Sequence, residues 1–298
     1  MKHAYLIIAH NEFSILQRLV QQIDDERNDI YIHIDKKVNN FNETYIKESV
    51  NKSKIKFIKD SYYVKWGGYS QIEAEMILFN EAYYGGNYRY FHLLSGVDMI
   101  LKDQNYIHDF FKRNDGYEFI SCATREHVKQ MNIVNRFNSY INIQYAGIIK
   151  RIYMKLYNKL GIKRYNNKFE ISYGSNWCSI TYNFVKYILD NKNWIRRTFE
   201  YSHACDEVYK QCLIINSEFK ERLYLARNKQ DNIMESDNMI SFNLRYIDWN
   251  QGRPNPKIFT MSDYDKIISS TCIFARKFSE KIDNDVIEKI RYYVNNKC

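Results

Sequence analysis

Long apolar runs, paired cysteines and nucleotide-binding glycine motifs are missing from this chain of 298 residues. The apolar run that ends at Ala9 is too short for a signal-peptide core or for a membrane span, which needs about 20 apolar residues. A first β-strand explains it better. We therefore expect a protein that is neither exported by that route nor inserted in a bilayer.

Cysteines are few and scattered. No two of them form a Cys-x-x-Cys pair, and no Cys/His cluster has the spacing of a metal site. We expect them to be reduced and mostly buried, as in a cytoplasmic protein. The six are Cys122, Cys178, Cys205, Cys212, Cys272 and Cys298.

Glycine and proline are also scarce, with 10 and 2 residues respectively. No linker, internal repeat or low-complexity segment divides the chain, so we expect one globular unit. Both prolines, Pro254 and Pro256, fall in a single loop. The absence of a Gly-x-Gly-x-x-Gly or Walker motif argues against a dinucleotide oxidoreductase and a P-loop enzyme.

The formal net charge is +9. Such a charge favours an anionic partner, which leaves open a nucleic acid, an acidic membrane surface or a phosphorylated substrate.

Short apolar runs alternate with helix-like stretches in the first 125 residues. This alternation predicts an α/β fold with a mostly parallel sheet flanked by helices. The expected strands are residues 4–9, 29–35, 55–58, 89–94 and 118–122, and the expected helices are residues 13–23, 70–84 and 105–113.

Polar segments follow three of these strands, at residues 9–12, 33–37 and 95–98. In an open parallel sheet, ligands bind beyond the carboxyl ends of the strands. We expect the three segments to line one crevice. The alternative is that they are ordinary strand-terminating turns.

Asp206 and Glu207 form a carboxylate pair where a helix is expected to begin. Val208, Cys212 and Ile215 share one face at near-helical spacing. Anions are favoured in the first turn of a helix, and an acid held there by the backbone is well placed to act as a general base. The alternative is that Asp206 caps the helix and Glu207 is only a solvated neighbour.

Two basic clusters follow, at residues 253–257 and 276–277. Arginine and lysine together suit a diphosphate, although a solvated basic edge is the alternative. Trp249 precedes the first cluster. It could stack on a sugar or base, or belong to the core.

Metal-binding signals are weak. The sequences Asp263-Tyr264-Asp265 and Asp283-Asn284-Asp285 have the Asp-x-Asp pattern, but both stand where helices are expected to begin. We interpret these acids as caps and first-turn charges, and expect no metal site.

A basic stretch at residues 148–164 has the pattern of an amphipathic helix. This pattern predicts either contact with an anionic membrane or a solvated helix that covers the core. Its apolar positions are Ile149, Ile152, Tyr153, Leu156 and Leu160.

The order of these motifs resembles the core-2/I-branching N-acetylglucosaminyltransferase family, which includes peptide O-xylosyltransferases. The resemblance covers nearly the whole chain. It implies one GT-A-like domain over residues 1–298, with a nucleotide-binding half at 1–125 and an acceptor-binding and catalytic half at 126–298. It also implies a UDP-sugar donor and inversion at the anomeric carbon without a required metal or other cofactor. The motifs are residues 4–11, 32–36, 94–98, 174–175 and 205–207, Trp249, and residues 274–278.

The resemblance also assigns roles to residues of this chain. Glu207 matches the base, and Lys277 and Arg253 match the cations that hold the diphosphate. The donor site is further expected to include Ala9, His10, His33, Asp35 and Arg276. The acceptor site is expected to include Asp98, Ser175, Asn176, Trp177, Asp206 and Trp249.

Members of the family in the secretory pathway carry an anchor and disulfides, and this chain shows neither. We therefore expect a bacterial enzyme in the cytoplasm, with peripheral contact at the inner membrane face as an alternative, acting on a saccharide or lipid-linked saccharide. GlcNAc is the first expectation for the sugar, before xylose, glucose and glucuronate. The rivals are a catalytically inactive glycan-binding protein and a nucleic-acid-binding module. The second of these predicts salt-dependent oligonucleotide binding in place of stabilisation by UDP.

Overall fold

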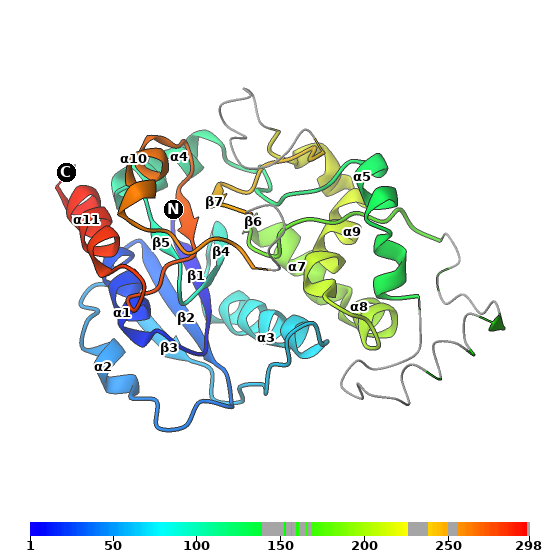
Figure 1. Ribbon diagram of the computed structural model, residues 1–298, viewed down its shortest axis with the longest axis horizontal. Coiled ribbons are helices and arrows are strands. Elements are labelled where there is room, and N and C mark those ends of the chain that lie inside the picture. Colours follow the sequence, from blue (N-terminus) through cyan, green and yellow to red (C-terminus); the bar gives the residue numbers. More distant parts are fainter. Residues whose placement is uncertain are drawn as a thin grey trace.

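A central sheet of five strands runs through the molecule (Figure 1). The computed structural model describes residues 1–138, 152, 156, 159–160, 165, 168–225, 238–249 and 255–296. The strand order is β3-β2-β1-β4-β6, with the first four strands parallel and β6 antiparallel to β4. The strands are β1 (His3–Ala9), β2 (Asn28–Ile34), β3 (Lys54–Phe57), β4 (Tyr90–Ser95) and β6 (Ser179–Thr181).

A second, three-stranded sheet has the order β5-β8-β7. Its strands are β5 (Met99–Ile100), β7 (Arg245–Ile247) and β8 (Phe274–Arg276). Each sheet contains strands from both predicted halves, because β6 joins the first sheet and β5 joins the second. The division at residues 125 and 126 therefore stays a functional prediction.

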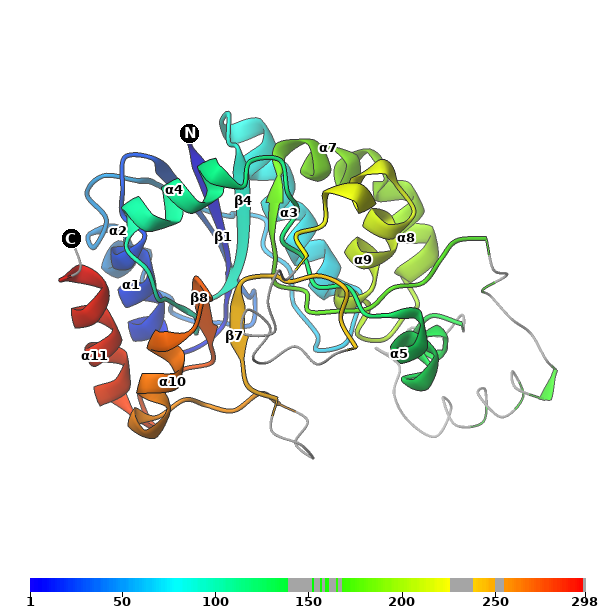
Figure 2. The ribbon, with the colours of Figure 1, turned by 90° about the horizontal axis from the view of Figure 1, so that it is seen from above.

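Helices cover both faces of the central sheet (Figures 1 and 2). Side chains alternate along β1: Tyr5 and Ile7 enter the core beneath α1, α4, α10 and α11, while Ala4 and Leu6 enter the core beneath α3, α7, α8 and α9. A strand buried on both faces must be apolar throughout, which explains its sequence. The helices are α1 (Phe13–Gln22), α2 (Glu43–Lys47), α3 (Ser70–Gly85), α4 (Gln104–Arg113), α5 (Arg125–Gln130), α7 (Tyr182–Asp190), α8 (Lys192–Phe199), α9 (Tyr209–Ile215), α10 (Tyr264–Ser269) and α11 (Asn284–Asn295).

The predicted α/β architecture is confirmed, as are four of the five expected strands and all three expected helices of the first half. The strand expected at residues 118–122 is wrong. Glu118 makes a single bridge to Leu223, and Phe119 makes one to Ser179. Because successive residues pair with different partners, no continuous ladder forms.

The helix expected to begin at the carboxylate pair is also corrected. Asp206 and Glu207 lie in a separate 3-10 turn, Cys205–Glu207, and α9 begins only at Tyr209. Ala204 adopts a left-handed conformation with φ of 48°, which turns the chain into the short helical turn. Neither acid caps a helix through its side chain, so the capping alternative for Asp206 is wrong.

The Asp-x-Asp motifs at the C-terminal helices do cap. Asp283 accepts a hydrogen bond from the Val286 amide at the start of α11, over 3.1 Å. Asp263 completes a capping box with Thr260 and pairs with Lys257 over 2.5 Å. The predicted capping role is therefore confirmed for Asp263 and Asp283.

The described cysteines, which are all but Cys298, are buried and form no disulfide, as predicted. Within the described ranges, no helix combines the length and the apolar character needed to cross a bilayer.

A fully buried arginine joins the two sheets. Arg245, on β7, donates to the carbonyl of Cys178 over 2.6 Å and to that of Leu93 over 3.3 Å. It also donates to Ser179 Oγ over 2.9 Å, and its guanidinium lies 4.5 Å from the ring centre of Phe274. Burial lowers the pKa of Arg245 to about 10, but the group remains charged at neutral pH. The β7–β8 pair is thereby fixed against β4 and β6.

A buried ion pair fixes α9 against α3. Lys210 Nζ contacts Glu75 Oε2, and both side chains are almost completely excluded from solvent. The same carboxylate accepts hydrogen bonds from Tyr209 over 2.7 Å and from Asn176 over 3.3 Å. Because a buried charge is tolerated only when it is paired and hydrogen-bonded, these contacts define how the two helices dock.

Three buried histidines lie together where β1 and β4 meet α4. His92 Nε2 is 3.1 Å from His3 Nδ1, and the rings of His3 and His108 stack with centroids 4.2 Å apart. Burial lowers the pKa of each histidine, and that of His108 falls to about 4 with a further contribution from Arg27. The cluster is therefore neutral at pH 7.

Acidification should weaken the fold through His108. Its pKa is about 4 in the folded protein and about 6.5 when unfolded, so between pH 7 and pH 5 only the unfolded chain takes up this proton. The loss should be about 2 kcal/mol. In His108→Gln the amide can still donate to Asn28 Oδ1, which His108 Nε2 approaches to 3.0 Å. Urea unfolding at the two pH values should therefore show a smaller loss in the variant, and equal losses would contradict this assignment.

Removing one member of the α3–α9 ion pair should cost more than removing both. Lys210→Met leaves the buried Glu75 carboxylate without its cation, and we expect a loss of about 3 kcal/mol in the free energy of unfolding. Glu75→Gln combined with Lys210→Met removes both charges and should recover part of that loss. Urea unfolding at pH 7 measures both. A Lys210→Met protein as stable as the unaltered one would show that the pair does not hold α9.

Candidate functional site

The carboxyl ends of β1, β2 and β4 meet at one edge of the central sheet, as predicted. The Asp35 amide donates to the Ala9 carbonyl over 2.9 Å, and the Gly96 amide donates to the Ile8 carbonyl over 2.9 Å. Gly96 permits this approach, because a Cβ there would lie 2.7 Å from the Ala9 Cβ. Ala9 itself is buried and contributes backbone to this edge.

Asp35 and His33 hold the loop at residues 61–66 against this edge. Asp35 Oδ1 accepts from the amides of Lys37 over 2.9 Å and Val64 over 3.4 Å. His33 is fully buried and accepts from the Tyr62 amide over 2.8 Å. Burial lowers the pKa of His33, which fits a neutral ring that accepts at Nε2. In this arrangement His33 holds the loop in place from a buried position.

His10 and Lys277 lie close together at the end of β1. His10 is exposed, and the charges of Asp35, Lys37 and Lys277 all act on its ring. Lys277 is partly buried, and burial, followed by repulsion from Arg276, lowers its pKa. Its ammonium forms no ion pair or hydrogen bond among the described residues. A cation held without a counterion at a strand edge is suited to receive an anionic group.

Arg276 connects this edge to Trp177 and Asp98. Its guanidinium lies 4.3 Å from the ring centre of Trp177, and its Nε is 3.7 Å from Asp98 Oδ1. Burial lowers the pKa of Arg276, while Asp98 and then Glu207 oppose that shift. Arg276 Nε and Nη1 are buried without a hydrogen-bond acceptor among the described residues. Such orphaned donors are uncommon in a finished core and suit a site that receives a ligand.

Asp98 is itself buried and lies in the turn between β4 and β5. Its Oδ2 accepts from the Ser95 amide over 2.9 Å. Burial raises the pKa of Asp98, and Arg276 opposes that rise. In the structure, Asp98 therefore orients Arg276 and shapes the turn.

Glu207 is held by an arginine. Arg136 Nη1 lies 2.8 Å from Glu207 Oε2 and also donates to the Ala204 carbonyl over 3.0 Å. The Arg136 guanidinium packs 4.7 Å from the ring centre of Tyr173. The Glu207 side chain is 25% exposed, and no described residue hydrogen-bonds its Oε1. One carboxylate oxygen is thus positioned while the other remains available to a substrate.

Asp206 has different surroundings, although it is the adjacent residue. It is buried, and its Oδ2 accepts from Gln71 Nε2 over 3.0 Å. Burial, followed by the charges of Glu207 and Glu75, raises its pKa to about 7. A group that binds a proton near neutrality and faces α3 suits positioning of the turn better than direct contact with substrate.

The segment containing Ser175 and Asn176 lies beside this turn. The Gly174 amide donates to the Glu207 carbonyl over 3.0 Å. A Cβ at Gly174 would meet the Ser121 carbonyl oxygen at 2.0 Å, so only glycine fits. The Ser175 amide donates to Ser121 Oγ over 2.8 Å. Asn176 Nδ2 donates to Glu75 Oε1 over 3.3 Å, beside the buried ion pair described above.

Arg253 lies outside the described residues, and Trp249 is not brought into this cluster. Trp249 is 53% exposed, so the core alternative for it is wrong. In the described part of the chain it makes no ring contact or hydrogen bond with the other predicted site residues.

Sequence reasoning missed Arg136, Gln71, Glu75 and Lys210. Glu75 and Lys210 are far apart in the chain and carry no motif. A lysine inside an otherwise apolar helical run, at 210, was the one available signal. Among the described residues, no group of three His, Cys, Asp or Glu side chains gathers as a metal site.

Comparisons with known proteins found relatives that match most of this chain. A xylosyltransferase of Caenorhabditis briggsae is 23% identical over 87% of this chain and 32% of its own length. Xylosyltransferase 2 of Rattus norvegicus is 20% identical over 98% of this chain and 33% of its own length. The chain thus spans about a third of these relatives.

Mouse xyloside xylosyltransferase 1, solved in its apo form, aligns with a TM-score of 0.42 and 9% identity, over 92% of this chain and 96% of that one. The family described as Core-2/I-Branching enzyme matches residues 3–270. Because that match covers most of the sequence, the chain belongs to the Core-2/I-branching enzyme family.

Proposed function

We propose that this protein is an inverting glycosyltransferase that moves a sugar from a UDP-sugar to a saccharide hydroxyl without a required metal. The observation that carries the proposal is the geometry of Glu207. Its carboxylate is anchored by Arg136, partly exposed, and close enough to Arg276 to affect the pKa of that arginine. Family membership supports the same conclusion.

The proposed reaction needs one base and a set of cations. Glu207 takes the proton from the acceptor hydroxyl while the oxygen attacks the anomeric carbon opposite the bond to UDP. That bond breaks, and UDP leaves with the electron pair. Lys277 and Arg276 balance the charge that develops on the diphosphate. Arg253 is a third cation in this proposal, on the strength of the family resemblance alone.

We rank the candidate donor sugars by the support that each has. GlcNAc follows from the family resemblance, and the product would carry a β-linkage. Xylose is the second candidate, because the curated relatives given above are named xylosyltransferases. Transfer of glucose or glucuronate would use the same residues. UDP release from each of these four UDP-sugars in turn would separate them.

For the acceptor and the cellular location we propose only a class. A bacterial polysaccharide or a lipid-linked saccharide in the cytoplasm is our proposal for the acceptor. Most of the predicted amphipathic segment at residues 148–164 lies outside the described residues, so contact with an anionic membrane stays a prediction. Of its apolar positions, Ile152, Leu156 and Leu160 are described and exposed.

Glu207→Gln should lower turnover by about 10² to 10⁴ while UDP still binds, because the amide keeps the size of the side chain but cannot accept the proton. UDP release in the presence of EDTA measures turnover, and UDP-induced thermal stabilisation measures binding. Glu200→Gln changes a nearby surface glutamate, paired with Arg196, and should behave like the unaltered protein. Near-normal turnover by Glu207→Gln would end the assignment of the base. Activity that returned only with Mn²⁺ would end the metal-free mechanism.

Lys277→Ala should weaken UDP binding, because it removes an ammonium that has no counterion among the described residues. We expect a loss of about tenfold, equivalent to 1.4 kcal/mol, with a smaller dependence of binding on salt. Calorimetric titration with UDP at two salt concentrations measures both effects. Lys281→Ala removes an exposed lysine four positions away and serves as the matched control. Equal affinity in the two variants would remove Lys277 from the diphosphate site.

A further inference from the structure

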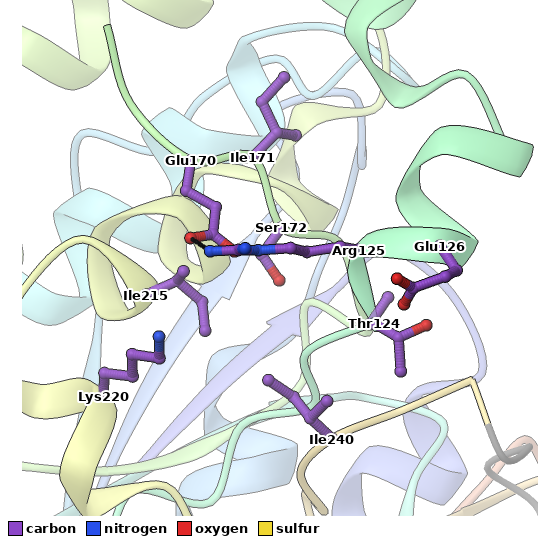
Figure 3. Close-up of a pocket in the computed structure, with 10 residues that line it drawn as sticks. Thr124, Arg125, Glu126, Glu170, Ile171, Ser172, Ile215, Lys220 and Ile240 are labelled. Atoms are coloured by element: carbon purple, nitrogen blue, oxygen red, sulfur yellow. Dashed lines mark hydrogen bonds and ion pairs between the residues drawn. The ribbon is translucent and has the colours of Figure 1, made fainter. Parts of the chain in front are cut away.

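A pocket of about 250 Å³ opens at the far end of α9 from Glu207 (Figure 3). It belongs neither to the strand edge nor to the carboxylate turn described above. Ten residues line it, from the segments at 123–126 and 170–172, the end of α9, and the residues that follow α9. They are Ala123, Thr124, Arg125, Glu126, Glu170, Ile171, Ser172, Ile215, Lys220 and Ile240.

The lining has an apolar wall and an unsatisfied hydroxyl. Ile215 lies across the pocket from Thr124 and Glu126, and Ile240 lies below them (Figure 3). Ser172 is 2% exposed, and its Oγ has no hydrogen-bond partner among the described residues. A buried hydroxyl without a partner costs free energy, which a polar ligand in this space would recover.

An exposed ion pair forms part of the polar rim. Arg125 and Glu170 form two parallel hydrogen bonds of 2.6 Å each across the upper side of the pocket. The Glu170 amide donates to Asn216 Oδ1 over 2.8 Å, and Asn216 Nδ2 donates back to the Glu170 carbonyl over 2.7 Å. The hydrogen bond from Arg125 also lowers the pKa of Glu170, so this acid stays ionised. Lys220 contributes a further positive charge near Glu170.

The pocket lies a short way from the proposed base. Ser172 and Gly174 are two positions apart and so are separated by at most about 7 Å. The Gly174 amide in turn lies 3.0 Å from the Glu207 carbonyl oxygen. Gly174 thus joins the wall of the pocket to the carboxylate turn, and an acceptor longer than one sugar unit is needed to reach both.

We propose that this pocket is a subsite for a neutral pyranose ring in the acceptor saccharide, one or two units from the hydroxyl that reacts. The assignment of this ring to the acceptor saccharide rests on the proposed function. The binding of a pyranose ring rests on the lining of the pocket alone. Thr124, Ser172 and Lys220 supply donors around such a ring, and Glu126 supplies an acceptor. The isoleucine methyl groups contact its apolar C–H face.

Other ligands fit the lining less well. A multiply charged anion would meet the carboxylates of Glu126 and Glu170 together with the cations. A nucleobase gains most from an aromatic face, and none of the ten lining residues is aromatic. A balanced set of donors and acceptors beside an apolar wall is what a hydroxyl-rich ring requires.

Isoleucine methyl NMR tests binding directly. The full chain, labelled at the isoleucine δ1 methyl groups, is titrated with methyl β-D-galactopyranoside, methyl β-D-glucopyranoside and the methyl glycoside of GlcNAc, with inorganic phosphate as the anionic probe. We expect at least one glycoside to shift the signals of Ile171, Ile215 and Ile240. Ile240→Trp, which fills the pocket, should abolish the shifts at the other two. Ile282→Trp, a change at an exposed isoleucine outside the pocket, should keep them.

Response to phosphate alone, no response to any glycoside, or unchanged shifts in Ile240→Trp would overturn the proposal. The role in the acceptor is tested with an oligosaccharide that supports UDP release. Ile240→Trp should raise the KM for that acceptor by about tenfold and leave the KM for the UDP-sugar unchanged. An unchanged acceptor KM would refute that role. Glycoside binding combined with normal turnover by Glu207→Gln would overturn the catalytic assignment and leave the subsite standing, so the two failures are distinguishable.

Discussion

The buried ion pair between Glu75 and Lys210 is the constraint on which the geometry of the site depends. Glu75 is carried by α3, which packs on the central sheet, and Lys210 by α9, which follows directly from the carboxylate turn. Glu75 also holds Asn176, and Lys210 Nζ approaches the Asp206 carbonyl to 3.3 Å. Because neither charge can leave its partner without a large desolvation penalty, the pair fixes the turn relative to the carboxyl edge of the sheet.

The second sheet positions the cations by the same logic. Arg245 and Arg276 stand on paired strands, but their environments differ. Arg245 donates most of its hydrogen bonds to carbonyl oxygens and to Ser179, and so holds the two sheets together. The Arg276 guanidinium packs on the Trp177 ring, and its Nε lies 3.7 Å from Asp98 Oδ1. Its Nε and Nη1 have no hydrogen-bond acceptor among the described residues. A guanidinium that is oriented but not satisfied has little to reorganise when a diphosphate arrives, and such preorganisation is what favours charge stabilisation.

The sequence predicted those parts that local pattern determines. Doubly buried parallel strands leave apolar runs, and polar residues after them mark the edge where ligands bind, so the convergence of residues 9–12, 33–37 and 95–98 was predictable. The pairing of Arg136 with Glu207 was not, because an ion pair between residues 71 positions apart leaves no periodic trace. The turn at Asp206 was mistaken for a helix start because the left-handed conformation of Ala204 cannot be inferred from a residue that favours helices.

The two adjacent acids show how environment, more than residue type, assigns a role. Burial and the nearby charge of Glu207 raise the pKa of Asp206 to about 7, so near neutrality Asp206 is partly protonated. Glu207 instead pairs with Arg136 and is partly exposed to solvent. A protonated neighbour adds no second negative charge beside a carboxylate that must itself accept a proton. In the proposed function, Asp206 therefore positions the turn and Glu207 acts as the base.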